Sequence, residues 1–114
     1  MEDCIFCRIS RGEMKADVVY SDERVMAFRD INPQAPVHVL VIPHEHLRSV
    51  FDMQERHRDL LFHIFEVIRK VSEDEGIAGS GVRVLTNVER GAGQSVFHLH
   101  FHVLGGREML WPPG

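Results

Sequence analysis

Apolar runs separated by turn residues dominate the first 43 residues of the chain. Residues 5–11 predict a short helix that places Phe6 and Ile9 on one face and ends at Gly12. Val18–Ser21 and Val25–Arg29 are rich in β-branched and aromatic residues on either side of a polar break, which predicts a β-hairpin. Residues 37–42 form an apolar run that ends at Pro43, a pattern typical of a central strand.

The middle of the chain has the period of an amphipathic helix. Asp52 and Glu55 have the spacing of a capping box, which predicts that the helix begins there. Gly76 is suited to end the helix, because glycine readily adopts the left-handed conformation that follows a last helical turn. In between, apolar residues recur three and four positions apart, at Leu60, Leu61, Ile64, Phe65, Ile68 and Val71.

Two more strands are predicted in the last third of the chain. Residues 82–87 form one, a glycine-bearing loop spans residues 89–95, and residues 96–104 form the last. The fold class that follows is α+β, with a mostly antiparallel, five-stranded sheet mainly in meander order, one long helix and one short helix. The 114 residues fit a single domain with the bounds 1–114.

The last predicted strand carries the main chemical signal. Successive side chains of a strand point to opposite faces, so one face is the apolar set Phe97, Leu99, Phe101 and Val103. The other face is a row of three imidazoles about 6.5 Å apart, from His98, His100 and His102. Burying three histidines without partners is unfavourable, so this row indicates function.

The histidine row allows two kinds of chemistry. A zinc hydrolase that uses His98 and His100 as ligands is one alternative, although the outer two positions are about 13 Å apart and one ion does not fit all three. A histidine nucleophile is the other. The preceding loop, with Gly93, Gln94 and Ser95, offers N–H groups and a hydroxyl to an anion such as phosphate, which favours a nucleophile beside an anion cradle.

Composition narrows the range of partners. The net charge of −4 argues against a nucleic-acid-binding surface, which usually needs a basic face. No stretch approaches the ~20 apolar residues of a membrane span, and Met1, Glu2 and Asp3 do not begin a secretion signal, so we expect a cytoplasmic protein without a membrane partner. So short a chain forms a deep cleft with difficulty, and a partner subunit is expected to complete the site.

The only two cysteines form a C-x-x-C pair, Cys4 and Cys7. In a reducing compartment this spacing favours metal or redox chemistry over a structural disulfide. A thioredoxin-like role is less favoured, because no strand precedes the pair. Two thiolates supply half of a tetrahedral zinc site, and two free thiols remain the alternative.

The run from Gly93 to Leu104 resembles the signature of the histidine triad (HIT) family, and the resemblance continues through residues 28–38, 105–107 and 111–114. The chain is most similar to the purine nucleoside phosphoramidase branch. That resemblance implies a homodimer with a continuous sheet that hydrolyses AMP-linked phosphoramidates through a nucleotidyl-histidine intermediate. Hydrolysis of dinucleoside polyphosphates, as in a sister branch, and a purine-nucleotide-binding module with little turnover are the alternatives.

The resemblance also implies roles for individual residues. His100 is then the nucleophile, His38 and His102 flank it, and Ser95 and Gln94 lie near the scissile bond. The remaining nucleotide-binding positions are Phe6, Ile9, Phe28 and Ile31 around the base, Asp30 on the ribose, Asn87 and Gly93 beside the phosphate, Val96, and Trp111 in a tail that reaches the partner's site. Without the resemblance, the four residues placed around the base can also be read as core residues, and Trp111 is equally consistent with a residue that only covers core surface.

The zinc ligands are completed by the same resemblance. Some bacterial family members combine the C-x-x-C pair with two histidines, which correspond here to His46 and His98. Four protein ligands close the coordination sphere, so Cys4, Cys7, His46 and His98 are expected to hold a structural Zn²⁺.

Overall fold

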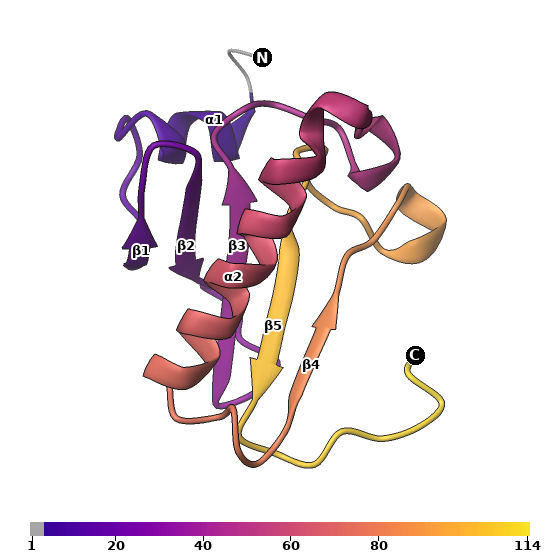
Figure 1. Cartoon of the computed structure of the whole chain (residues 1–114). Helices are drawn as coiled ribbons and strands as arrows, with labels where there is room; N and C mark the ends of the chain where they lie inside the picture. Colours follow the sequence, from indigo (N-terminus) through magenta and orange to yellow (C-terminus); the bar gives the residue numbers. More distant parts are fainter. Residues whose placement is uncertain (1–3) are drawn as a thin grey trace.

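The computed structural model describes residues 4–114, so the prediction drawn from Met1, Glu2 and Asp3 lies outside the described residues. Two α-helices are formed, α1 (Ile5–Ser10) and α2 (Arg58–Asp74), together with short 3₁₀ turns at Val50–Asp52, Glu55–His57 and Arg90–Ala92. The strands are β1 (Val18–Ser21), β2 (Val25–Arg29), β3 (Val37–Pro43), β4 (Val82–Leu85) and β5 (Phe101–Gly105) (Figure 1). Within residues 4–114, neither helix combines the length and apolar character needed to span a bilayer.

The five strands form one antiparallel sheet in the order β1-β2-β3-β5-β4. The predicted α+β class and the hairpin are confirmed, and β3 is the central strand. The order departs from a meander at one place. After β3 the chain crosses the sheet as α2, forms β4 at the edge, and returns as β5 between β3 and β4 (Figure 1).

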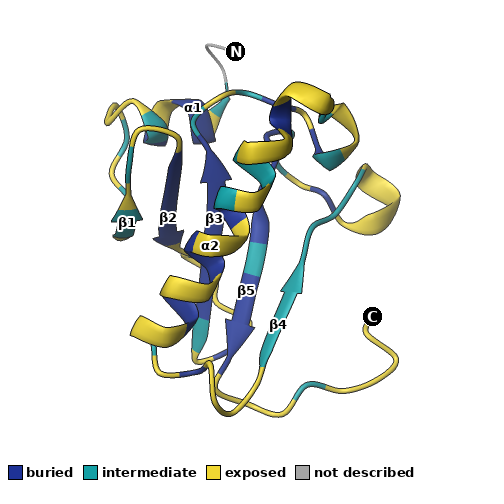
Figure 2. Cartoon of the chain, viewed as in Figure 1, coloured by how far each residue is buried: buried dark blue, intermediate teal, exposed yellow. Residues whose placement is uncertain are grey.

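Helix α2 covers one face of the sheet. Its buried residues Ile64, Val67, Ile68 and Val71 follow helical spacing and pack on the sheet, while its outward side is exposed (Figure 2). Phe65, which the sequence places on the buried stripe, is 46% exposed and contacts Phe101 edge-on, with ring centroids 5.4 Å apart. The prediction that Gly76 ends the long helix is confirmed, because Gly76 follows α2 with a φ of 75°.

Helix α1 covers the opposite face. Alternation along β3 sends Val39 and Val41 toward α2, and sends Leu40 and Ile42 into a second apolar cluster with Phe6 of α1. His38 lies two residues before Leu40, and His102 pairs with Leu40 across the β3–β5 ladder. Both histidines therefore point to the α1 face.

The capping box predicted at Asp52 and Glu55 is wrong. Met53 and Gln54 have extended backbones, and the Asp52 carboxylate turns back to accept a hydrogen bond from the Arg48 N–H at 3.0 Å. The cap instead pairs Gln54 with His57, whose Nδ1 accepts from the Gln54 N–H at 2.9 Å. Helix α2 consequently begins at Arg58.

The last two strands are shorter than predicted. β5 begins at Phe101 rather than at residue 96, because the Leu99 N–H bonds to the Leu47 carbonyl at 2.7 Å instead of to β3. Leu99, Phe101 and Val103 lie in the core as expected, but Phe97 is only half-buried, with the Arg48 guanidinium 4.2 Å above its ring. β4 ends at Leu85 rather than at residue 87.

Candidate active site

A cavity of about 280 Å³ lies between α1 and the sheet. Nine of its lining residues are among those predicted from the sequence, namely Phe6, Ile9, Phe28, Asp30, Ile31, Ser95, Val96, His100 and His102. Six lining residues were missed, namely Ile5, Met14, Lys15, Ala16, Arg29 and Leu40. Alternation along β3 would have identified Leu40, because it shares a face with His38. Nothing in the sequence signals Met14, Lys15 and Ala16, which lie in the connection from α1 to β1.

His100 has one ring nitrogen fixed and one free. Its Nδ1 lies 2.7 Å from the His98 backbone carbonyl, and because a carbonyl only accepts, Nδ1 carries the proton. Nε2 then holds the lone pair and makes no hydrogen bond within residues 4–114. The Thr86 hydroxyl donates to the His100 carbonyl at 2.8 Å, which also fixes the backbone. His100 lines the cavity, so the arrangement presents a nucleophilic nitrogen to a ligand.

His102 is oriented by a chain of two hydrogen bonds. The Gln34 N–H donates to His38 Nδ1 at 3.0 Å, so His38 carries its proton on Nε2. That Nε2–H donates to His102 Nδ1 at 2.9 Å. The remaining proton of His102 is therefore on Nε2, where it is available to an anion such as a phosphate oxygen.

Burial keeps these imidazoles neutral. It lowers the pKa of His102 to about 4, with help from the neighbouring rings of His100 and His38. It also lowers the pKa of His38, against the opposing charge of Asp30, and the pKa of His100, against its hydrogen bond to the His98 carbonyl and the charge of Asp30. A neutral ring is what a nitrogen nucleophile requires near pH 7.

Several predicted residues lie outside the cavity lining or at its rim. Asn87 lies beside Gly93, whose added Cβ would be 3.8 Å from the Asn87 amide nitrogen, and Gly93 has a φ of 94°. Trp111 is 82% exposed in the C-terminal tail. Ile31 does line the cavity, yet it is 99% exposed, so it stands at the rim.

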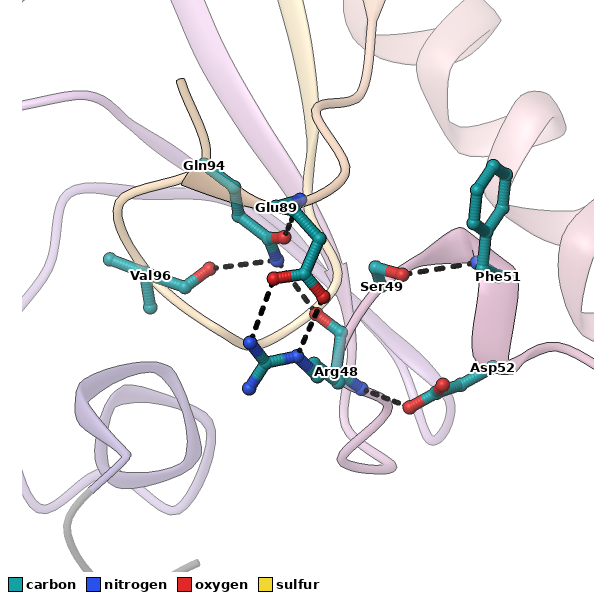
Figure 3. Close-up of polar contacts among 7 residues, drawn as sticks. All are labelled: Arg48, Ser49, Phe51, Asp52, Glu89, Gln94 and Val96. Carbon is teal, nitrogen blue, oxygen red and sulfur yellow. Dashed lines mark hydrogen bonds and ion pairs between the residues drawn. The ribbon is translucent and has the colours of Figure 1, made fainter. Parts of the chain in front are cut away.

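Gln94 is used to hold the loop in place. Its amide oxygen accepts from the Glu89 N–H at 2.7 Å, and its amide nitrogen donates to the carbonyls of Arg48 and Val96 at 2.7 and 3.2 Å (Figure 3). The Arg48 guanidinium also pairs with the Glu89 carboxylate at 2.9 Å. These contacts fix the loop that carries Ser95 into the cavity lining.

Cys4, Cys7, His46 and His98 converge as the thiol–imidazole cluster, with their four ligand atoms within 4.8 Å of one another. Cys4 Sγ and Cys7 Sγ lie 3.3 and 3.5 Å from His98 Nδ1, and Cys7 Sγ lies 3.3 Å from His46 Nδ1. The His98 Nε2–H donates to the Pro43 carbonyl at 2.8 Å, which leaves the Nδ1 lone pair toward the sulfurs. These residues fit a tetrahedral zinc ion in donor type, spacing and support.

The family model for the HIT domain matches residues 11–109. The chain belongs to the HIT family. The purine nucleoside phosphoramidase of Escherichia coli is 45% identical to this HIT chain over 108 residues, which are 95% of the chain and 91% of the relative. The 14 kDa zinc-binding protein of Zea mays is 46% identical over 112 residues, 96% of the chain and 87% of the relative.

Solved structures agree with this fold. A crystal structure of a HIT family hydrolase from Legionella pneumophila matches with a TM-score of 0.96 and 46% identity, covering 98% of this chain and 100% of that chain. The predicted family resemblance and fold class are thereby confirmed.

Within this HIT chain, the three histidines of the predicted row have different surroundings. The side chain of His98 belongs to the thiol–imidazole cluster, whereas His100 uses Nδ1 on a backbone carbonyl. This geometry does not favour the alternative in which His98 and His100 bind one catalytic zinc.

A second group of metal-type ligands is formed by Asp30, His38 and His102. Here the hydrogen bonds oppose metal binding, because His38 Nδ1 accepts from Gln34 and the proton occupies Nε2, the atom that faces the other two residues. This group is a hydrogen-bond relay.

Proposed function

We propose that this HIT protein hydrolyses the P–N bond of purine nucleoside 5′-phosphoramidates of the AMP type, with His100 as the covalent nucleophile. The observation that carries the proposal is the fixed Nδ1–H of His100, which leaves Nε2 as a neutral nitrogen at the cavity, without a hydrogen-bond partner among residues 4–114. The 45% identity to a purine nucleoside phosphoramidase supports the substrate class.

The cavity offers complementary surfaces to each part of such a nucleotide. The apolar side chains of Phe6, Ile9 and Phe28 suit a purine ring, and the Asp30 carboxylate suits the ribose hydroxyls. The His102 Nε2–H and the Ser95 hydroxyl are donors for phosphate oxygens.

The reaction then takes two steps. His100 Nε2 attacks the α-phosphorus, the P–N bond breaks, and the amine leaves with a proton, for which Ser95 and His102 are the nearby donors. The His98 carbonyl, as acceptor from Nδ1–H, stabilises the positive charge that develops on the ring. Water then attacks phosphorus, the bond to His100 breaks, and the proton from water restores the site, giving AMP and the free amine.

The decisive experiment is to trap the intermediate. The protein is mixed with an adenosine phosphoramidate, quenched with denaturant, digested and examined by mass spectrometry, and an adenylyl group is expected on His100. His100→Ala should lose the adduct and turnover but retain AMP binding. His63→Gln changes a histidine outside the cavity and serves as the control. An adduct on another residue, or full turnover by His100→Ala, would overturn the proposal.

The same assay separates the alternative functions. Faster turnover of diadenosine polyphosphates than of the phosphoramidate would indicate the dinucleoside polyphosphate reaction. Tight purine nucleotide binding with no adduct and no product would indicate a binding module.

Zinc is proposed as a structural ion at the thiol–imidazole cluster. Four protein ligands leave no position for a reacting water, so the ion would hold α1 against the β3 and β5 ends without entering the reaction. Purified protein is expected to contain one zinc per chain, and Cys7→Ser, at a residue that does not line the cavity, should lower that content.

A homodimer is proposed as the working state. Edge strand β4 pairs only with β5 within residues 4–114, and the large apolar side chains Phe51, Phe62 and Trp111 are 80%, 69% and 82% exposed. Pairing of two β4 edges would continue the sheet, and the tail with Trp111 would then be placed to reach the partner's cavity. Sedimentation velocity should give the mass of two chains, and a monomer at micromolar concentration would contradict it.

A further inference from the structure

Helix α1 carries residues of two different sites within a few positions. Cys4 is its N-cap and Cys7 lies in its first turns, and both contact imidazoles of the thiol–imidazole cluster. Phe6 and Ile9 line the nucleotide cavity. A helix this short does not form by itself in water, so its position depends on these tertiary contacts.

Phe6 connects the two sites directly. Its ring stands edge-on to His98 of the cluster, with centroids 6.0 Å apart, and edge-on to the nucleophile His100, with centroids 5.1 Å apart. It also packs on Phe28, another wall of the cavity, at 5.4 Å. A displacement of Phe6 therefore alters both the wall of the cavity and the surroundings of His100.

His98 provides a second connection. Its ring nitrogen Nδ1 faces the sulfurs of the cluster, while its backbone carbonyl holds the Nδ1–H of His100 at 2.7 Å. An ion that fixes the His98 ring thus also fixes the residue that sets the His100 tautomer.

We infer that zinc at the thiol–imidazole cluster and a purine nucleotide in the cavity bind cooperatively, with α1 and its residue Phe6 as the coupling element. Each ligand favours α1 seated against the sheet, so the ordering of α1 by the first ligand need not be repeated for the second. The inference rests on the proposed function in one respect, that the nucleotide occupies this cavity.

Cooperativity between two ligands is reciprocal. If zinc strengthens AMP binding by a given factor, AMP must strengthen zinc binding by the same factor. We expect a factor of about five or more, at the lower end of common coupling strengths. A zinc ion that only stabilises an already folded chain would leave the AMP affinity of that chain unchanged, so a factor above one in the folded chain is the sign of coupling.

The experiment measures both directions on the whole, zinc-loaded chain. Zinc loss to a chromogenic chelator is followed with and without saturating AMP, and AMP affinity is measured by calorimetry before and after zinc removal. AMP should slow zinc loss several-fold. Ribose 5-phosphate, which lacks the base that contacts Phe6, should slow it much less. If the zinc-free chain unfolds, the comparison of AMP with ribose 5-phosphate on the loaded chain, together with the α1 variants, decides the question.

Variants on α1 locate the coupling. Phe6→Leu should keep one zinc per chain but reduce the effect of AMP on zinc loss. Arg8→Ala changes an exposed residue of the same helix and should leave that effect unchanged. Equal zinc-loss rates with and without AMP, or a folded chain that takes up no zinc, would overturn the inference. None of these measurements needs turnover, so a failure of the proposed reaction would be seen separately, as AMP binding without an adduct.

Discussion

His38 Nε2 lies 2.9 Å from His102 Nδ1, and the Gln34 N–H, 3.0 Å from His38 Nδ1, decides the direction of the bond between the two rings. A backbone amide can only donate, so the proton positions on both histidines follow from it. The position of the Nε2 proton of His102, a residue that lines the cavity, is thus set by the backbone of Gln34, which does not line it.

Replacement of His38 should therefore affect turnover more than binding. His38→Leu removes the donor to His102 Nδ1, and kcat for phosphoramidate hydrolysis is expected to fall about 100-fold, within the range for a positioned proton donor. KM should change little. His38→Gln keeps a donor amide and should recover part of the loss. Equal kcat for His38→Leu and the unchanged protein would contradict the relay.

Much of the fold was predictable because local pattern and tertiary structure agree. The spacing of Ile64, Ile68 and Val71 and the alternation of Leu99, Phe101 and Val103 place the core on the correct faces. The family resemblance adds residue roles that periodicity cannot supply.

The element boundaries that the sequence predicted wrongly depend on individual hydrogen bonds rather than on the hydrophobic pattern. The start of β5 depends on a bond from Leu99 to Leu47, and the start of α2 on the turn of Asp52 back to Arg48, neither of which a local pattern records. His98 and His100 share a motif, but their roles separate because His98 meets Cys4, which lies 94 residues earlier in the chain. The participation of Lys15 in the cavity has the same origin, since it depends on how the loop from α1 to β1 packs beside the cavity.

The ion pair between His63 of α2 and Asp22 of the β1–β2 turn predicts a pH dependence of stability. The His63 Nε2 lies 2.6 Å from the Asp22 carboxylate, and this hydrogen bond raises the pKa of His63, against burial and Arg24, which lower it, and with a further hydrogen bond to Glu66, which raises it. Burial alone would raise the pKa of Asp22, but hydrogen bonds from Tyr20, His63 and the turn backbone hold it well below its usual range. Asp22 is therefore ionised throughout the neutral range.

The pKa of His63 is higher in the folded chain than in the unfolded chain, where it is about 6.5. The contribution of the His63–Asp22 pair to the free energy of unfolding is therefore complete below the unfolded-state pKa and is lost as the pH rises through the folded-state pKa. The difference in unfolding free energy between the unchanged protein and His63→Gln should be about 0.5–1 kcal/mol near pH 6 and should shrink by about pH 8.5. Urea unfolding of both proteins at each pH measures it. A difference that grows with pH would contradict the assignment.

In the loop that carries Ser95, we expect the loss of the buried contacts of Gln94 to cost more stability than the loss of the exposed ion pair of Glu89. Gln94 is 3% exposed and satisfies three backbone groups, so Gln94→Ala should destabilise the protein by about 1–3 kcal/mol and raise KM by loosening Ser95. Glu89→Gln breaks only the exposed pair with Arg48 and should leave stability unchanged within error. Denaturant unfolding and steady-state kinetics test both, and equal effects of the two substitutions would refute the contrast.

Gly105 tests how tightly the end of the histidine-bearing strand is packed. A Cβ at this residue would lie 2.6 Å from Ile77 Cδ1 and 3.0 Å from the backbone oxygen of Gly81, and the backbone oxygen cannot move without shifting the start of β4. Gly105→Ala should therefore destabilise the protein by about 1–3 kcal/mol, the usual cost of overpacking. Gly79→Ala, with nothing within 4 Å of its added Cβ, is the matched control and should cost less.

Thermal unfolding of the Gly105→Ala and Gly79→Ala variants measures both costs. Gly105 ends β5, the strand that carries His102. If the added methyl group shifts the backbone of β5, kcat should also fall, whereas a shift confined to β4 should leave kcat unchanged. Equal stability of the two alanine variants would show that Ile77 and Gly81 yield without cost, and the tight packing inferred for this end of β5 would then be wrong.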